Sequence, residues 1–169
     1  MPESGAFIVA ANHRSLADPP LIGVSSQRPV HFLAKEELFR FRPFGWLISN
    51  LNAHPLKRAS HDVKALKAAK EILGSGDPII LFPEGRRSKT DTLQPAKAGV
   101  GMLSSLTGAP VIPAYIHNSG YLKEFRRLSV LFGAPLYPQN FDSYQAMADA
   151  TMLEISKLQK HLQEGGAPS

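Results

Sequence analysis

Apolar residues along this chain gather in short runs that alternate with stretches of helical spacing. Short, mainly apolar runs are typical of strands that are buried on both faces of a sheet. Four segments fit this pattern: Phe7–Ala11, Pro29–Ala34, Pro78–Pro83 and Pro110–His117. Leu51–Leu56 and Leu128–Leu131 are shorter strand candidates, and we expect the second to lie near a sheet edge.

Helical spacing fills the first intervals between these strands. Asp18 and Pro19 are expected to begin a short helix that runs to Ser25, with Asp18 as the N-cap and Pro19 at the first helical position. A longer helix is expected to begin at Ser60 and to end at Gly74, where glycine favours termination.

Two further helices are predicted in the second half of the chain. The segment Ala96–Thr107 is rich in small residues and is followed by Gly108. An amphipathic helix follows Asp142, which resembles a capping box together with Gln145.

The order of these elements predicts the fold class. Strands alternate with helices as far as Gly108, and such alternation requires crossover connections between parallel strands. We therefore predict an α/β fold with a largely parallel central sheet flanked by helices. The chain has 169 residues, 43% of them hydrophobic, and no linker divides it, so we expect a single domain.

Composition narrows the chemistry. A formal charge of +5 and a pI of about 9.6 favour an anionic partner, such as a phosphorylated metabolite, an anionic lipid or a nucleic acid. The chain has no cysteine, which excludes disulfides, thiol nucleophiles and cysteine-ligated zinc. The histidines lack metal-ligand spacing, so no metal site is predicted. No apolar run is long enough to span a bilayer.

The most informative polar pattern is His13 followed five residues later by Asp18. A histidine titrates near neutral pH, so it can take a proton from a hydroxyl and later return it. A nearby carboxylate can fix which ring nitrogen carries the hydrogen. Residues five apart do not share a helix face, so this pairing requires a turn between a strand end and a helix start. The alternative is a polar loop histidine beside a helix cap.

A second polar group, Glu84 to Ser88, follows another predicted buried strand. Gly85 permits a tight turn or close approach of the backbone to a ligand. Arg87 can hold a phosphate through two parallel hydrogen bonds. Glu84 would repel a phosphate directly, so we expect it to bind an acceptor hydroxyl or to hold an arginine in place. The alternative is an ordinary charged turn.

Isolated basic residues give weaker signals. Arg58 follows a short apolar segment and, on its own, is most simply a solvated surface arginine. Lys35 is similar. Lys97 lies at the start of a predicted helix, where an anion is electrostatically favoured.

Four segments occur in an order that matches a known set of sequence boxes: His13–Asp18, Lys35–Gly45, Phe82–Ser88 and Val111–Pro113. The first fits a His-x4-Asp pattern. The third reads Phe-Pro-Glu-Gly-Arg-Arg-Ser and differs at one position from Phe-Pro-Glu-Gly-Thr-Arg-Ser. Together, over about residues 7–135, they resemble the PlsC-like glycerolipid acyltransferases, a family that includes the 1-acylglycerol-3-phosphate acyltransferases.

This resemblance implies an activity. A fatty acyl group would pass from acyl-CoA or acyl-carrier protein to a hydroxyl of lysophosphatidic acid or a related lysophospholipid, in phospholipid biosynthesis. His13 would act as general base and Asp18 would orient it. Attack by the acceptor hydroxyl would be direct, with an acyl intermediate on Ser15 as the minor alternative. The thioester is a substrate, and no cofactor or metal is expected.

The resemblance also implies a site for the acceptor phosphate. Arg58 stands at the position of a phosphate-binding arginine, and Glu84, Gly85 and Arg87 would complete the site. Arg86 replaces the threonine that is usual in the family, which adds positive charge beside this site.

A membrane contact is predicted within Lys35–Asn50, where Pro43 and Gly45 argue against one continuous helix. Arginines beside aromatic residues suit a lipid interface. The residues concerned are Phe39, Arg40, Phe41, Arg42, Phe44 and Trp46. Packing of these aromatic residues in the core is the alternative.

We expect a peripheral protein on the cytoplasmic face of a membrane, with an anionic membrane surface as partner. Family members commonly carry an N-terminal membrane-docking segment. We expect residues 1–169 to form the acyltransferase domain without that segment.

Two alternatives to an active enzyme remain at this point. One is a non-catalytic phosphate- or nucleic-acid-binding module that uses Lys123, Arg126 and Arg127. Its binding would weaken steeply with salt and would not require His13. The other is a truncated relative that has lost activity. If the protein is an acyltransferase, no nucleic-acid partner is expected.

Overall fold

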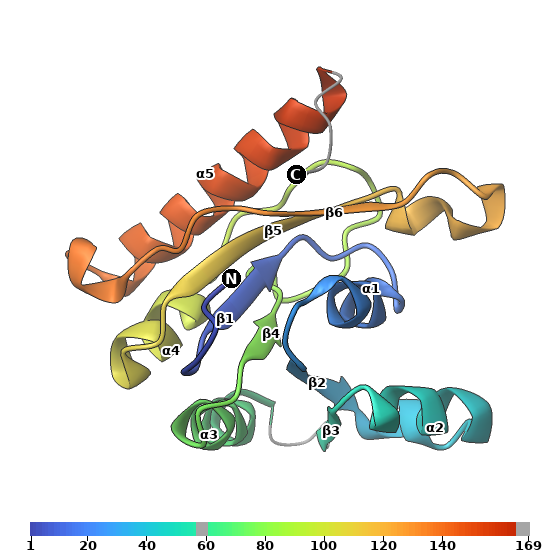
Figure 1. Cartoon of the computed structure of the whole chain (residues 1–169), viewed down its shortest axis with the longest axis horizontal. Helices are drawn as coiled ribbons and strands as arrows, with labels where there is room; N and C mark the ends of the chain where they lie inside the picture. Colours follow the sequence, from blue (N-terminus) through green and yellow to red (C-terminus); the bar gives the residue numbers. More distant parts are fainter. Residues whose placement is uncertain (57–60, 165–169) are drawn as a thin grey trace.

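A computed structural model describes residues 1–56 and 61–164 and shows one six-stranded sheet (Figure 1). The strand order is β3-β2-β4-β1-β5-β6, and all neighbours are parallel except the antiparallel pair β5 and β6. The strands are β1 (Ile8–Ala11), β2 (His31–Lys35), β3 (Ala53–Leu56), β4 (Ile79–Leu81), β5 (Val111–His117) and β6 (Ser129–Phe132).

Helices connect most of these strands. The α-helices are α1 (Asp18–Ser25), α2 (Arg42–Asn50), α3 (His61–Gly74), α4 (Gly99–Thr107) and α5 (Tyr144–Gln163). Short 3-10 helices are η1 (Glu36–Phe39), η3 (Ser119–Glu124) and η4 (Pro138–Asn140). The predicted α/β fold with a largely parallel sheet flanked by helices is therefore confirmed, and β6 lies at the sheet edge as expected.

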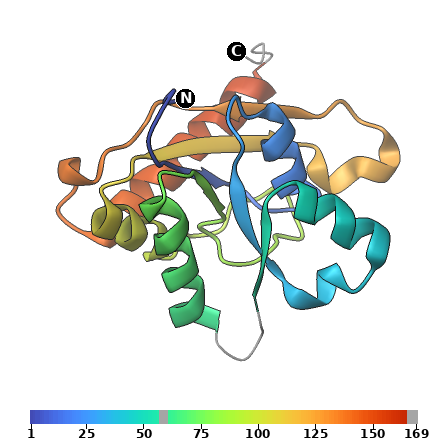
Figure 2. The same ribbon diagram turned by 60° about the horizontal axis from the view of Figure 1, so that its bottom comes forward.

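Both faces of the sheet are covered, which explains why its strands are apolar runs without alternation. In β1, Val9 and Ala11 point to a cluster that includes Ile22 of α1 and Ile48 of α2. The intervening residues of β1 point to the opposite cluster, to which α3, α4 and α5 contribute Leu73, Leu103 and Met147 among others. Figures 1 and 2 show the resulting three layers of helix, sheet and helix.

Two predicted helix caps are wrong. Ala17 occupies the N-cap of α1, and Asp18 is its first residue. Asp18 does not cap the helix because its Oδ2 atom accepts hydrogen bonds from residues that precede it. At α5 the N-cap is Ser143, whose hydroxyl accepts a hydrogen bond from the Ala146 amide at 3.1 Å, so the cap lies one residue after Asp142. The expected cap Ser60 lies outside the described residues.

The segment between β2 and β3 is broken as predicted, but the break comes earlier than Pro43. It separates η1 from α2 at Arg40 and Phe41, and Pro43 lies in the first turn of α2, where its missing amide hydrogen costs nothing. Gly45 lies inside α2 for a packing reason. A Cβ atom there would come within 2.5 Å of the Phe39 carbonyl oxygen, so only glycine lets α2 approach η1.

The sheet topology places three loops at the same edge. Parallel strands β1, β4 and β5 are neighbours, so the segments that follow their carboxyl ends emerge side by side. These segments carry the His13 box, the Glu84 box and η3. Across residues 1–56 and 61–164, no helix has the length and apolarity needed to cross a bilayer.

Candidate active site

His13 and Asp18 form a hydrogen-bonded pair at the carboxyl end of β1. His13 Nδ1 lies 2.7 Å from Asp18 Oδ2. A carboxylate only accepts hydrogen bonds, so in the neutral form of the ring Nδ1 carries the hydrogen and Nε2 keeps its lone pair. The turn expected between the two residues is present, because α1 starts directly at Asp18.

Asp18 is fully buried and is held by the backbone of its own loop. Its Oδ2 atom also accepts hydrogen bonds from the amides of Arg14, at 2.6 Å, and Ser15, at 2.7 Å. These bonds, together with the bond to His13, hold the buried carboxylate in one orientation. The loop thus fixes the carboxylate, and the carboxylate fixes the orientation of the His13 ring.

The His13 ring and backbone are also held from β4. The ring stacks on Phe82, with centroids 3.9 Å apart and an interplanar angle of 15°. The His13 amide donates to Glu84 Oε1 at 3.1 Å, and the His13 carbonyl accepts from the Ser88 amide at 2.7 Å. The loop after β4 therefore binds both sides of the His13 peptide backbone.

Asn12 joins this strand end to β5. Its side-chain amide donates to the Ile116 carbonyl at 3.0 Å, and its Oδ1 accepts from the Ile116 amide at 2.7 Å. This side chain extends the pairing of β1 with β5 by one step beyond the backbone ladder. Asn12 is buried, so the loss of either bond would leave a polar group without water.

Glu84 is buried, and both its oxygens accept bonds from backbone amides. In addition to the His13 amide, the Gln94 amide donates to Oε2 at 3.1 Å. Burial raises the pKa of the Glu84 carboxyl, and the two amide hydrogen bonds oppose that shift. The carboxyl group therefore links the His13 segment to the segment before α4, a contact that the sequence did not predict. Its expected role toward the acceptor stays a prediction.

Gly85 has the left-handed backbone angle, φ +70°, that a tight turn requires. Its amide donates to the Phe82 carbonyl at 2.9 Å. A Cβ atom at this position would lie 2.9 Å from Cε of Lys97, so the lysine side chain crosses directly over the turn. The structure thus brings together Gly85 and Lys97, which are twelve residues apart in the sequence.

Arg87 is exposed and lines an open groove of about 350 Å³ after β4. Among the residues that the structure describes, no carboxylate forms an ion pair with Arg86 or Arg87. Their charges are thus available to an anion. The groove is lined by Arg86, Arg87, Ser88, Lys89, Thr90 and Gln94. Arg58, the other predicted phosphate ligand, lies outside the described residues.

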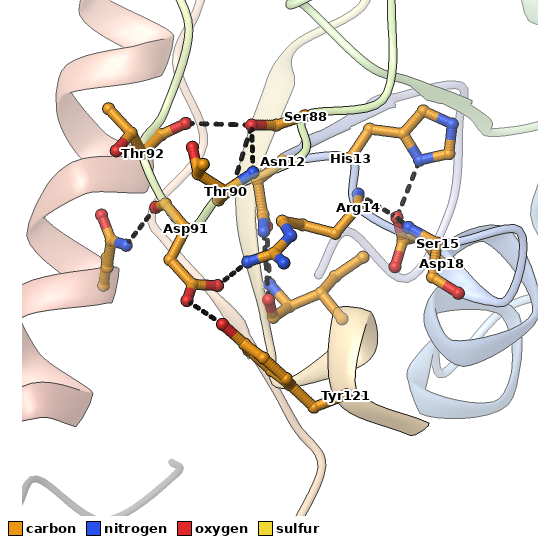
Figure 3. A network of polar contacts seen from close by, with 12 residues as sticks. Asn12, His13, Arg14, Ser15, Asp18, Ser88, Thr90, Asp91, Thr92 and Tyr121 are labelled. Carbon is orange, nitrogen blue, oxygen red and sulfur yellow. Dashed lines mark hydrogen bonds and ion pairs between the residues drawn. The ribbon is translucent and has the colours of Figure 1, made fainter. Parts of the chain in front are cut away.

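A network around Arg14 had no signal in the sequence. Arg14 forms an ion pair with Asp91, and the Tyr121 hydroxyl donates to Asp91 at 2.8 Å (Figure 3). These residues come from two loops and from η3, and none belongs to a recognisable spacing pattern. The network lies directly beside His13 because Arg14 is the next residue.

The basic residues of the alternative binding module are partly engaged. Arg126 pairs with Glu124 at 2.6 Å, and its guanidinium lies over the Tyr121 ring, 4.3 Å from the centroid. An internal ion pair reduces the charge that this patch can offer to a polyanion.

The family model for acyltransferases matches residues 1–117, which contain both segments that build this site. The chain belongs to the acyltransferase family.

Curated relatives agree with this assignment. A 1-acyl-sn-glycerol-3-phosphate acyltransferase of Bacillus subtilis is 25% identical over 97% of this acyltransferase and 86% of the relative. The chloroplastic 1-acyl-sn-glycerol-3-phosphate acyltransferase BAT2 of Brassica napus is 32% identical over 67% of this chain, but the match spans only 33% of that longer protein.

A solved structure shares the fold. The 1-acyl-sn-glycerophosphate (LPA) acyltransferase PlsC of Thermotoga maritima superposes with a TM-score of 0.81 and 31% identity. The match covers 96% of this acyltransferase and 68% of that chain. The resemblance that the sequence boxes indicated is thereby confirmed.

The site of this acyltransferase combines a group suited to base catalysis with a positively charged surface on the neighbouring loop. His13 offers an acceptor nitrogen, Asp18 can stabilise the imidazolium, and Arg87 offers a positive charge on the neighbouring loop. Within the described part of the chain, no group of three or more histidine or acidic side chains is arranged to hold a metal ion.

Proposed function

We propose that this protein transfers a fatty acyl group from an acyl thioester, acyl-CoA or acyl-carrier protein, to the free hydroxyl of lysophosphatidic acid or a related lysophospholipid. This step belongs to phospholipid biosynthesis. The observation that carries the proposal is the His13–Asp18 pair, oriented at 2.7 Å beside an arginine-lined groove. The names of the relatives support the choice of acceptor.

In the proposed mechanism, His13 Nε2 takes the proton of the acceptor hydroxyl as its oxygen attacks the thioester carbonyl. The tetrahedral intermediate collapses, the carbon–sulfur bond breaks, and the His13 imidazolium returns the proton to the thiolate. The products are a carboxylic ester and a free thiol. Asp18 stabilises the imidazolium while it exists. Base catalysis of this kind contributes about 10²–10⁴-fold in rate.

Direct attack is favoured over an acyl-serine intermediate by the position of Ser15. Its hydroxyl accepts a hydrogen bond from the Ala17 amide at 3.2 Å and so stabilises the turn before α1. A nucleophile would instead need its hydroxyl against the basic nitrogen of His13.

For the acceptor phosphate, we propose Arg87 as a ligand, together with Arg58. Arg87 lies on the loop whose neighbours Glu84 and Ser88 bind the His13 backbone, so a phosphate there would be held near the base. Holding the acceptor in place in this way lowers the barrier through orientation. Arg86 and Lys97 add positive charge to the same region.

We also propose that the protein binds peripherally to an anionic membrane surface, on its cytoplasmic face, through α2 and the residues before it. Phe41 is 68% exposed and Trp46 is 70% exposed, and Leu47 is exposed beside them. Phe39 and Phe44 instead pack against the core, so the aromatic residues divide between the two expected roles. Arg40 and Arg42 are exposed next to Phe41. Exposed aromatic residues beside arginines suit the headgroup region of a bilayer.

The experiment that tests the activity is a thiol-release assay with acyl-CoA and lysophosphatidic acid, run on the wild type and on His13→Ala. We expect release that requires both the acceptor and His13. Normal release by a folded His13→Ala protein would contradict the proposal. An acyl-carrier-protein donor is the second arm, and no acyl transfer from either donor would overturn the assignment of the substrates.

A further inference from the structure

The loop after β4 is attached to the His13 segment at three points. Glu84 and Ser88 bind the His13 amide and carbonyl, as described above. The third point is the ion pair between Arg14 and Asp91 (Figure 3). Arg86 and Arg87 lie between Glu84 and Ser88 in the sequence. The attachments at these two residues therefore fix the backbone that carries the two arginine side chains.

The side chain of Arg14 is largely enclosed. Its side chain is only 12% exposed, and its guanidinium lies 5.1 Å from the Tyr121 ring centroid. A Cβ atom on Gly120 would lie 2.6 Å from Nη2 of Arg14, so glycine leaves the space for the guanidinium. Its buried Nε atom has no hydrogen-bond partner among the described residues. The ion pair with Asp91 therefore offsets a large part of the cost of enclosing this charge.

Asp91 is joined to two other elements as well. The Tyr121 hydroxyl of η3 donates to its Oδ2 atom at 2.8 Å, and Gln159 of α5 donates to its backbone carbonyl at 2.9 Å. Ser88 stiffens the same loop, because its hydroxyl donates to the Thr90 carbonyl at 2.9 Å. Asp91 therefore connects a surface loop to the His13 segment, to η3 and to α5.

We propose that Arg14 and Asp91, reinforced by Tyr121, are a positioning pair that fixes the loop of residues 84–92 against the His13 segment and thereby sets the position of Arg87 relative to His13. The consequence for catalysis rests on the proposed function. The contacts of His13 with Asp18, Glu84 and Phe82 involve neither the Arg14 side chain nor Asp91, so we expect them to persist when this pair is broken. The loss therefore falls on binding of the acceptor and not on proton transfer.

The test uses Asp91→Ala and Arg14→Met, separately and together. Asp91 is 55% exposed, so its substitution opens no cavity in the core, and the double variant also removes the enclosed charge that Asp91→Ala leaves unpaired. We expect the KM for the lysophospholipid to rise about tenfold in each single variant, with kcat and the KM for the thioester changed by less than about twofold. The KM for the lysophospholipid should rise no further in the double variant than in either single variant, because both substitutions remove the same interaction. Arg14→Lys, which keeps the charge, should recover part of the loss.

A second readout does not depend on turnover. Hydrogen exchange of residues 84–92, including the Ser88 amide that donates to His13, should become about tenfold faster in Asp91→Ala. Glu124→Gln is the matched control, because it breaks the exposed pair with Arg126 in the same region without touching Asp91. Tyr121→Phe should produce a smaller change in the same direction.

The outcomes separate the two proposals. Unchanged exchange and unchanged acceptor KM in Asp91→Ala, additive losses in the double variant, or equal effects of Glu124→Gln would overturn the positioning pair. Absence of turnover by the wild type would overturn the proposed function, and the exchange measurements on the same five variants and the control would still decide whether the pair fixes the loop.

Discussion

Asp18 is fully buried, and its carboxylate lies 2.7 Å from Nδ1 of His13. The same oxygen accepts hydrogen bonds from the amides of Arg14 and Ser15. The loop backbone therefore fixes the carboxylate that orients the ring. In the neutral ring this arrangement leaves Nε2, on the side away from Asp18, as the nitrogen that can accept a proton.

Asp18→Asn should therefore lower kcat strongly while preserving the shape of the side chain. The amide carries no negative charge and cannot stabilise an imidazolium as a carboxylate does, even when its oxygen keeps the hydrogen bonds that Oδ2 accepts. We expect kcat to fall by about 10²–10⁴-fold, and thiol release under saturating substrates is the measurement.

Ser15→Ala is the matched control for this prediction. It keeps the amide that donates to Asp18 and removes only the hydroxyl that accepts from Ala17. Activity within about twofold of the wild type is expected, because the substitution removes one hydrogen bond in the turn and leaves Asp18 and His13 in place. A loss as large as that of Asp18→Asn would revive the acyl-serine mechanism.

Arg87→Ala should weaken binding of the acceptor much more than binding of the thioester. A hydrogen-bonded charge contributes about 1.5–3 kcal/mol, so we expect the KM for lysophosphatidic acid to rise about 10–100-fold. Initial rates with each substrate varied in turn provide the measurement. Arg127→Ala, an exposed arginine outside the groove, is the control, and equal losses for both substrates would argue against a phosphate contact.

Membrane binding should depend on the exposed aromatic residues in α2 and at its N-cap. Phe41→Asp combined with Trp46→Asp should reduce flotation with vesicles that contain anionic lipid, because it replaces interfacial side chains with negative charge. Leu153→Asp on α5 is the control, since Leu153 is also exposed, at 57%, but lies on another helix. Flotation that is equal in the folded double variant and the control would contradict this contact.

The stability of the fold should decrease below about pH 6.5, in part through His54. Nδ1 of His31 lies 2.7 Å from Nε2 of His54, and burial, followed by the charge of His31, lowers the pKa of His54. The unfolded chain binds a proton at the ordinary pKa of about 6.5, whereas the folded chain resists it. Stability is therefore fully present above that value and falls as the pH drops toward the lowered pKa.

Chemical denaturation at pH 7.5 and pH 5.5 measures this loss. His54→Gln should reduce the difference between the two midpoints, because glutamine does not titrate. His117→Gln should remove a separate part, since burial lowers the pKa of His117 as well. An unchanged difference in both variants would show that other groups cause the acid sensitivity.

Much of the fold could be predicted because burial on both faces of a sheet leaves a direct trace in the sequence. The segments Phe7–Ala11 and Pro78–Pro83 contain β1 and β4, and the ends of these strands place His13 near Glu84. The caps were less predictable. Asp18 and Asp142 are typical N-cap residues, but neither caps its helix, because the hydrogen bonds that a side chain makes depend on the donors that the folded chain places around it.

The sequence by itself determined the α/β order, the two polar boxes and the family, because strand burial, turn residues and the spacing of His13 and Asp18 are local properties. Only the tertiary structure decided that Glu84 binds the backbone of His13 and that Asp91 pairs with Arg14. These partners are 71 and 77 residues apart. The physical reason is that a hydrogen bond or ion pair across such a separation depends on strand order and loop path, which no local pattern records.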